Sequence, residues 1–263
     1  HQRDQDRAGS AVPLGLHLEG PMLTPIRRGA HPEALLEPPS PELVADWSRS
    51  SGVSLVTLAP DLPGALEVIA TLVGRRVVVS LGHSDASAEQ FAAGLRAGAS
   101  YATHLFNGMR PFGHRDPGPI GAALADDRVV AGVIADGIHV DPVAVRMAWR
   151  TLGPQRFNLV TDAVATPPGP NGVRTADGVL AGSDLTLDRA VRNLVAWTGC
   201  AVDAAIATVT SAPADVLGLT DRGRLRVGAR GDVTVLDPRL HVVATIVGGV
   251  RSGDARSKGR DGP

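Results

Sequence analysis

Four residues that can bind a metal ion or move a proton stand where short apolar runs give way to polar residues. They are Glu19, His83, His104 and Asp162. A carboxylate with two imidazoles suits Zn²⁺ and leaves a coordination position open for water, and Fe²⁺ or Mn²⁺ fit the same ligand types. Asp162 is then the candidate acid/base, because a carboxylate beside an activated water can accept its proton and return it to a leaving amine. The alternative is that each residue is a structural strand end or helix cap.

The elements that must position these residues follow a strand–helix rhythm. Six apolar runs, rich in Val, Leu and Ile, are typical of parallel strands buried on both faces, at residues 11–20, 53–61, 76–85, 99–107, 129–139 and 156–163. Helices are expected at 41–50, 63–74, 87–98 and 141–153, with Ser87 as an N-cap and Pro142 at a helix start. This rhythm predicts an α/β fold, either a (β/α)8 TIM-type barrel, whose chemistry gathers at the carboxyl ends of the strands, or a doubly wound sheet.

The pattern changes after Asp162. A Pro/Gly-rich loop at 166–178 precedes expected helices at 183–199, capped by Ser183 or Asp184, and at 203–219, interrupted at Pro213. Strands at 233–236 and 242–247 indicate part of a small β domain. We therefore divide the chain into a barrel over 1–225, strands of a β domain over 226–251 and a disordered tail over 252–263.

Composition excludes several classes of partner. The 263 residues include 26 basic and 27 acidic side chains, so no basic field predicts nucleic-acid binding and no polybasic tract predicts a membrane surface. No apolar run reaches the ~18 residues that a membrane span needs, and the N-terminal residues lack the apolar core of a signal peptide. The single cysteine, Cys200, fits a reducing compartment such as the cytoplasm.

Other residues have the chemistry of substrate binders. His31 follows the basic pair Arg27 and Arg28, and the Gly/Pro-rich loop at 103–118 contains Arg115 and Gly108. Arginine offers a bidentate fork to a phosphate or carboxylate, and glycine allows backbone N–H groups to approach an anion. Arg115 and His139 are the candidate partners of an anionic group. The residues thus predict metal-assisted hydrolysis of a small anionic substrate.

A set of motifs also resembles a known family. GLHLEGP, RRGAH, LGHSDA, THLFNGM, ADGIHV, LVTDA and LAGSDLTLDRAVRN follow one another across the chain. In order and spacing they resemble the N-acetylglucosamine-6-phosphate deacetylases, members of the amidohydrolase superfamily with a TIM-type barrel and a small β-sandwich domain. The resemblance implies that Glu19, His83 and His104 bind the metal and that Asp162 is the acid/base. It also implies that His31 polarises the acetamide carbonyl.

The resemblance further implies how the substrate is held. Asn107 and Gly108 would contact it, His139 would meet its phosphate, and the pocket for the sugar would be lined by Ala181, Gly182 and Ser183. Arg115 would reach the phosphate bound by a neighbouring subunit, which implies a homodimer. The implied reaction belongs to amino-sugar catabolism and converts N-acetylglucosamine 6-phosphate into glucosamine 6-phosphate and acetate.

The chain departs from the family at its N-terminal side. Family members carry a longer region there, which holds the first two barrel strands, much of the β domain and an H-x-H or Q-x-N motif that this sequence lacks. The run at 11–20 is then expected to be an exposed edge strand, with His17 buried one layer below Glu19. Two alternatives stay open: a different substrate, such as N-acetylgalactosamine 6-phosphate, and a catalytically inactive truncated fragment.

Overall fold

The larger part of the molecule is one parallel sheet with helices around it. The computed structural model describes residues 9–165 and 172–252. Six strands lie side by side in chain order: β1 (Leu16–Glu19), β2 (Val53–Leu58), β3 (Val78–Leu81), β4 (Tyr101–Ala102), β5 (Val130–Val133) and β6 (Phe157–Leu159). Every pairing is parallel, which confirms the six predicted strands. Within the described residues the sheet does not close, so β1 and β6 are its edges.

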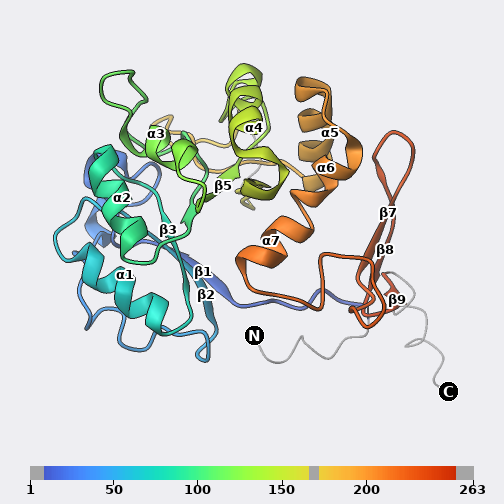
Figure 1. The fold of residues 1–263 in the computed structure, drawn as a ribbon, viewed down its shortest axis with the longest axis horizontal. Coiled ribbons are helices and arrows are strands. Elements are labelled where there is room, and N and C mark those ends of the chain that lie inside the picture. Colours follow the sequence, from blue (N-terminus) through green and yellow to red (C-terminus); the bar gives the residue numbers. More distant parts are fainter. Residues whose placement is uncertain (1–8, 166–171, 253–263) are drawn as a thin grey trace.

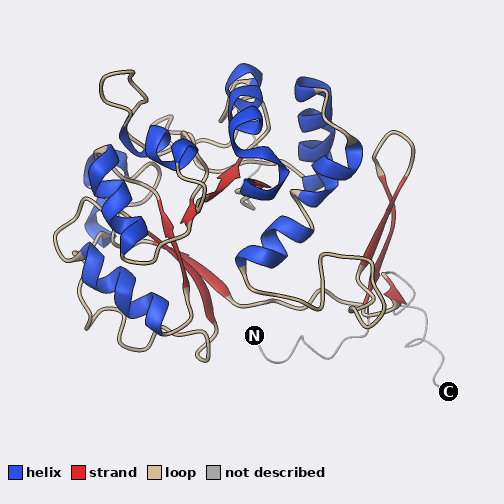
Figure 2. Cartoon of the chain, viewed as in Figure 1, coloured by secondary structure: helices blue, strands red, loops and turns tan. Residues whose placement is uncertain are grey.

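The helices connect and cover these strands (Figures 1 and 2). They are α1 (Ala65–Gly74), α2 (Ala88–Arg96), α3 (Gly118–Ala125), α4 (Pro142–Arg156), α5 (Leu187–Thr198), α6 (Val202–Ala207) and α7 (Ser211–Val216). Because the strands are parallel and in register, their carboxyl ends meet at one edge, and Glu19 pairs with Thr57, which pairs with Ser80. The loops that carry the predicted site residues all leave from this edge.

Two predicted helix starts are confirmed by their hydrogen bonds. Ser87 Oγ accepts from the Gln90 N–H at 3.2 Å and Gln90 Oε1 accepts from the Ser87 N–H at 2.9 Å, a reciprocal capping box at the start of α2. Pro142 is the first residue of α4, and the Asp141 carboxylate accepts from the Val143 N–H at 2.7 Å.

Other predicted elements were wrong. Residues 41–50 form turns, because the hydroxyls of Ser48 and Ser51 bond to one another and to the Asp46 carbonyl in place of a helical ladder. Neither Ser183 nor Asp184 caps α5, which begins after Thr186. The break between α6 and α7 precedes Pro213, which lies inside α7. Helix α3, which follows a Gly/Pro-rich loop, was missed.

A small antiparallel sheet stands at one end of the molecule (Figure 1). It contains the predicted β7 (Val233–Leu236) and β8 (Val242–Val247) and a short third strand, β9 (Val250–Arg251), that the sequence analysis missed. The chain passes this sheet at Gly9, beside Val250, before it reaches β1. Of the tail predicted over 252–263, only Ser252 is described, and residues 253–263 lie outside the described residues, as does part of the Pro/Gly-rich loop, residues 166–171.

Burial is uneven across the parallel sheet. All six residues of β2 are buried, and Leu58 is 0% exposed. On the edge strand β1, by contrast, Leu16 is 48% exposed, and His17 is exposed although it was expected to be buried. The missing neighbour on that side explains the difference, because nothing among the described residues covers the outer edge of β1.

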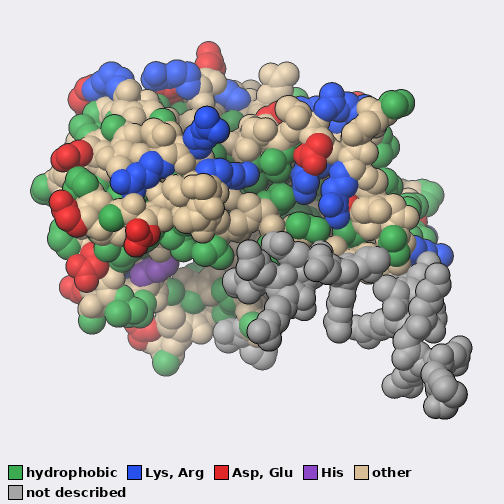
Figure 3. All heavy atoms as spheres, turned by 90° about the horizontal axis from the view of Figure 1, so that it is seen from below, with side chains coloured by type: hydrophobic (Ala, Val, Ile, Leu, Met, Phe, Trp, Pro, Cys, Tyr) green, Lys and Arg blue, Asp and Glu red, His purple; other side chains and the backbone are tan. Residues whose placement is uncertain are grey.

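The surface fits the charge balance of the sequence. On the face drawn in Figure 3, basic side chains lie across the middle and acidic ones gather toward one margin, so neither sign covers that face. Among the described residues, no helix has both the length and the apolar character needed to cross a membrane.

Candidate metal centre

Three predicted ligands converge at the carboxyl edge of the sheet. Glu19 is the last residue of β1, and His83 and His104 each lie two residues beyond β3 and β4. Glu19 Oε1 is 3.0 Å from Nε2 of both histidines, and the two Nε2 atoms are 3.1 Å apart. The imidazole rings meet edge to face, with centroids 4.8 Å apart. One oxygen and two nitrogens thus form a nearly equilateral triangle.

The chemistry of this triangle fits a divalent cation. His83 Nδ1 lies 2.7 Å from the Arg27 carbonyl, which can only accept, so Nδ1 carries the proton and Nε2 of the neutral ring carries a lone pair. Ligands about 2.05 Å from a tetrahedral ion lie roughly 3.3 Å apart, close to the spacing of these three atoms. A carboxylate and an imidazole lone pair that face each other repel unless a cation or a proton lies between them. These residues therefore fit a metal with nitrogen and oxygen ligands.

The charges of the cluster are set by competing effects. Burial raises the pKa of Glu19, but its contacts with the imidazoles of His104, His31 and His83 outweigh burial and hold that pKa far below its usual range. Burial lowers the pKa of His104, yet the contact with Glu19 and the charge of Asp162 outweigh burial and raise it. Glu19 is therefore ionised, and the surrounding negative charge favours a positive charge on or between the imidazoles.

His31 brings a fourth group to the cluster. It lies in the loop after β1, with Nε2 3.4 Å from Glu19 Oε2 and its ring edge against His83. Glu19, His31 and His83 by themselves also satisfy the spacing of a metal site. His104 lies closer to Glu19 than His31 does, so the tighter triangle has His104 as its third member. His31 faces the other oxygen of the carboxylate.

Unusual backbone conformations aim these side chains. His83, His104 and Asp162 have φ angles of 48°, 26° and 49°, in the left-handed region that side chains other than glycine rarely adopt. Each residue lies just past a strand end, where an extended backbone would alternate side chains above and below the sheet. The left-handed turn redirects each side chain. Such strain is characteristic of functional sites.

Asp162 stands beside the predicted sugar-binding segment. Its side chain is exposed, and its negative charge adds to that of Glu19 in raising the pKa of His104. Burial lowers the pKa of His17, and the charges of Glu19 and Asp162 oppose this effect. The Asp162 carbonyl accepts from the Ser183 N–H at 2.8 Å, and Ser183 Oγ donates to the Thr161 carbonyl. A Cβ on Gly182 would lie 2.8 Å from the Asp162 carbonyl oxygen, so the segment of Ala181, Gly182 and Ser183 packs closely against this loop.

Asn107 and Gly108 lie in the loop that follows His104. Asn107 Nδ2 donates to the carbonyl of His104 at 3.2 Å. A Cβ on Gly108, whose φ is 59°, would lie 2.8 Å from His83 Nδ1, so the backbone passes directly beside that imidazole. The structure thus brings both residues next to the candidate ligands.

Two predicted phosphate contacts lie farther along the carboxyl edge. His139 follows β5 and has Nδ1 2.6 Å from Asp136 Oδ2. Arg115 is exposed on the loop between β4 and α3 and makes no hydrogen bond or ion pair with the rest of the described chain. Within this chain, the structure therefore does not connect Arg115 to the cluster of Glu19, His83 and His104.

A hydroxyl chain beneath the ligands was missed by the sequence analysis. His17 Nε2 lies 2.7 Å from Thr57 Oγ1, which lies 2.7 Å from Thr103 Oγ1, which in turn bonds to Ser80. Its only signal was single polar residues inside the apolar runs of β2, β3 and β4. These hydrogen-bonded hydroxyl groups occupy the layer of side chains just below Glu19.

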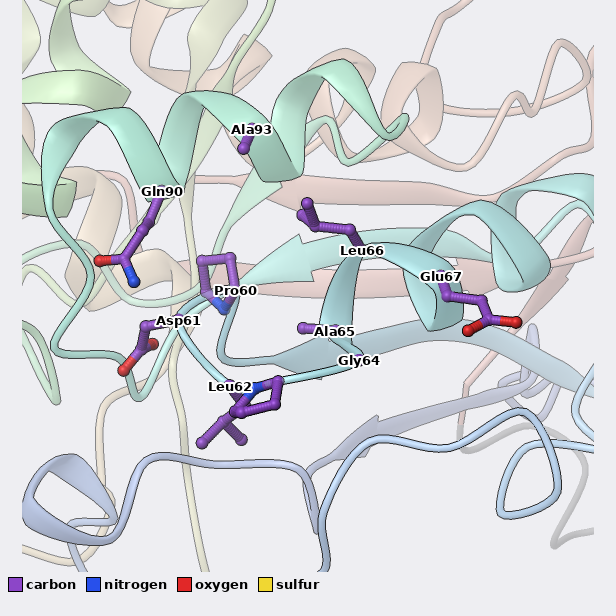
Figure 4. A pocket seen from close by; sticks show the side chains of 10 residues that line it. Pro60, Asp61, Leu62, Gly64, Ala65, Leu66, Glu67, Gln90 and Ala93 are labelled. Atoms are coloured by element: carbon purple, nitrogen blue, oxygen red, sulfur yellow. The ribbon is translucent and has the colours of Figure 1, made fainter.

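Two cavities border these elements. One, of about 370 Å³, opens beside β1 and includes Glu19 and His31 in its wall. The other, of about 500 Å³, lies between the start of α1 and α2 (Figure 4) and contains none of the predicted site residues. Of these two cavities, the one beside β1 is therefore the one that borders the candidate metal cluster.

Comparisons with known proteins agree with this geometry. The model of the amidohydrolase family matches residues 3–255. An N-acetylglucosamine-6-phosphate deacetylase of Lysinibacillus sphaericus is 37% identical and covers 92% of this chain. The human deacetylase of the same name is 41% identical and covers 90%. An N-acetylgalactosamine-6-phosphate deacetylase of Escherichia coli O157:H7 is 40% identical over 92% of the chain.

Solved structures give the same result. An N-acetyl-D-glucosamine-6-phosphate deacetylase mutant of Mycobacterium smegmatis, in complex with N-acetyl-D-glucosamine 6-phosphate, is 38% identical with a TM-score of 0.86, over 90% of this chain and 68% of its own. The Thermotoga maritima enzyme is 35% identical with a TM-score of 0.86, over 91% and 69%. This chain spans 67% of the Lysinibacillus relative and 64% of the human one. Its fold, motifs and site place the chain in the amidohydrolase family, where it groups with the N-acetylglucosamine-6-phosphate deacetylases.

Proposed function

We propose that this chain forms the catalytic part of a metal-dependent deacetylase that converts N-acetylglucosamine 6-phosphate into glucosamine 6-phosphate and acetate. The observation that carries the proposal is the triangle of Glu19, His83 and His104, with Asp162 close enough to raise the pKa of His104. The similarity to deacetylases of this name supports the substrate.

Each residue of the cluster has a role in this proposal. Glu19, His83 and His104 hold a divalent ion, which when bound polarises the amide carbonyl and activates water. Zn²⁺ suits the ligand set best, with Fe²⁺ or Mn²⁺ as alternatives. Asp162 accepts a proton from the attacking water and delivers it to the amine nitrogen as the C–N bond breaks. His31 donates a hydrogen bond to the acetamide oxygen.

Other residues hold the sugar and its phosphate. Asn107, Gly108 and the segment from Ala181 to Ser183 frame the sugar, and His139 binds the phosphate. Arg115 serves the site of a second subunit in a homodimer, a role supported by its exposure on a loop without partners in the described chain. We also place the protein in the cytoplasm, since a phosphorylated substrate and the single Cys200 suit that compartment.

Two other candidates have observations in their favour. The galactosamine epimer is supported by the similarity to the Escherichia coli O157:H7 enzyme of that name. An inactive chain is supported by the exposed β1, because Glu19 then lies on the least covered strand of the sheet. For either candidate function, we keep the proposed division of the chain into a barrel over 1–225 and a β domain over 226–251.

The test measures acetate release by the full chain from both sugar phosphates with added Zn²⁺. Asp162→Asn should lower kcat by at least about 100-fold while metal binding is retained, because general acid/base catalysis contributes that much. Asp184→Asn is the matched control, since this exposed carboxylate pairs with Arg189. Unchanged turnover in Asp162→Asn would refute the mechanism, and no acetate from either sugar would favour the inactive chain.

Mixing two variants tests whether Arg115 acts in the site of a second subunit. Arg115→Ala should raise KM for the sugar phosphate, and Asp162→Asn should be inactive. If Arg115 acts across a homodimer, one site of each mixed dimer is intact, and an equal mixture recovers about a quarter of wild-type activity. If Arg115 acts within its own chain, no site in the mixture has both residues and activity does not return.

A further inference from the structure

We propose that Asp136 is a positioning residue that holds the His139 ring by its Nδ1–H so that Nε2 faces the substrate phosphate. The proposal rests on the function proposed above, in which His139 binds that phosphate. Asp136 and His139 lie in the loop between β5 and α4, and both side chains are only 5% exposed. A carboxylate and an imidazole buried to this degree require mutual pairing.

Three hydrogen bonds to one carboxylate determine the geometry. Asp136 Oδ1 accepts from the backbone N–H groups of Ile138 and His139, both at 2.8 Å. Asp136 Oδ2 lies 2.6 Å from His139 Nδ1, as short as the shortest charge-assisted bonds. These hydrogen bonds, with burial opposing them, hold the pKa of Asp136 below its usual range. Because the ionised carboxylate only accepts, His139 Nδ1 must carry a proton.

His139 therefore presents Nε2 as its free atom. Nε2 has no hydrogen-bond partner among the described residues, and it is not among their fully buried unpaired polar atoms. An imidazolium in this place can donate Nε2–H to a phosphate oxygen, and the Asp136 charge offsets the cost of holding that cation away from water. Asp136 acts through His139 and does not itself touch the substrate.

The chain contains an exposed counterpart of this arrangement. Asp237 Oδ1 accepts from the backbone N–H groups of Arg239 and His241, both at 2.8 Å. There, however, His241 Nδ1 is 3.4 Å from Asp237 Oδ2, and the two side chains are 55% and 34% exposed. A turn of this kind can therefore be held by the two backbone hydrogen bonds to the aspartate alone. The short, buried bond to the imidazole is specific to Asp136.

Asparagine at position 136 separates two roles of Asp136, which are to hold the turn and to orient His139. Its carbonyl oxygen can still accept from the backbone and preserve the turn. Its amide would donate to His139 Nδ1, so the ring would be neutral with its one proton on Nε2, and the charge that favours the imidazolium would be lost. A purely structural Asp136 would tolerate this change.

The experiment compares Asp136→Asn with Asp237→Asn. In Asp136→Asn, we expect KM for N-acetylglucosamine 6-phosphate to rise about 10-fold or more with little change in kcat, as for loss of one charge-assisted phosphate contact. Activity on unphosphorylated N-acetylglucosamine should be unchanged, as should all parameters of Asp237→Asn. Equal losses on both sugars, or no change in KM, would overturn the proposal.

Imidazole ¹⁵N spectra give a readout that does not depend on deacetylase activity. The wild-type His139 signals should show a protonated Nδ1 and should shift on titration with inorganic phosphate, whereas Asp136→Asn should lose both properties. In a His139→Gln background, Asp136→Asn should have no further effect on KM. Identical His139 spectra in wild type and Asp136→Asn would refute the role of Asp136, whereas absence of acetate release from wild type would refute only the enzyme assignment.

Discussion

Glu19 connects the two sides of the candidate metal centre through its two oxygens. Oε1 faces the imidazoles of His83 and His104, and Oε2 faces His31. The same carboxylate therefore completes the ligand triangle and places the residue proposed to contact the acetamide. Its hydrogen bonds, which hold its pKa far below the usual range against the opposing effect of burial, keep it ionised.

Glu19→Gln should abolish tight metal binding while the fold is retained. The amide keeps the shape of the side chain but removes its charge, so we expect at least about 100-fold weaker Zn²⁺ binding, measured by competition with a chelator. Zn²⁺ at 100 times its Kd should stabilise the wild type by about 2.7 kcal/mol, and the same concentration should stabilise the variant by about 0.4 kcal/mol or less. Glu33→Gln, at a side chain 69% exposed, is the control. Equal affinity in both variants would exclude Glu19 as a ligand.

The identities of the site residues could be predicted from the sequence, but the orientations of their side chains could not. Glu19, His83 and His104 could be found because each follows an apolar run, and parallel strands bring such positions together. The left-handed conformations of His83 and His104 could not be predicted from residue type, since most histidines have negative φ angles. They depend on contacts between loops that are distant in sequence, such as the bond between His83 Nδ1 and the Arg27 carbonyl.

At the scale of elements, Asp61 joins two loops that carry site residues. Asp61 Oδ2 accepts from Thr24 Oγ at 2.7 Å, and Oδ1 accepts from Ser84 Oγ at 2.6 Å. The Thr24 N–H donates to the His83 carbonyl at 3.0 Å, so Asp61 bonds to residues on both sides of the proposed ligand His83. In Figure 4, Asp61 lies at the end of β2 where it turns toward α1.

Asp61→Ala should loosen His83 and weaken metal binding. Two largely buried hydroxyls lose their acceptor, at a cost of about 1–3 kcal/mol each, and metal affinity should fall by about 10-fold. Both effects can be measured by denaturant unfolding and by metal titration. Glu67→Ala, an exposed change on α1 near the same cavity, should alter neither. Loss of stability with unchanged metal affinity would show that Asp61 does not position His83.

Sequence patterns predicted the strands better than the connections. The six parallel strands were found because runs of Val, Leu and Ile are a strong signal for buried strands. Residues 41–50 have apolar spacing compatible with a helix, but the hydroxyls of Ser48 and Ser51 satisfy backbone groups locally. Helix α3 was missed because Gly118 and Gly121 weaken its local preference, and packing against α2 decides its structure.

At the scale of the whole molecule, stability should be distributed unevenly across the sheet. The strand β2 lies between two neighbours and is buried throughout, whereas β1 has one neighbour among the described residues. The proposed ligand Glu19 is on the exposed strand, and the proposed ligands His83 and His104 follow interior strands. The metal centre thus joins the least covered strand to the core, and a bound ion would stabilise that edge most.

The same substitution, Leu→Ala, made in β2 and in β1 compares how much each strand contributes to stability. Leu58→Ala, at a side chain 0% exposed in β2, should cost about 2–5 kcal/mol of unfolding free energy, because a cavity remains in the core. Leu16→Ala, at a side chain 48% exposed in β1, should cost less than about 1 kcal/mol, because much of its surface is already in water. Denaturant unfolding of the metal-free chain gives both values. Equal costs would mean that β1 is packed as tightly as β2, and Glu19 would then stand on a strand as well supported as those before His83 and His104.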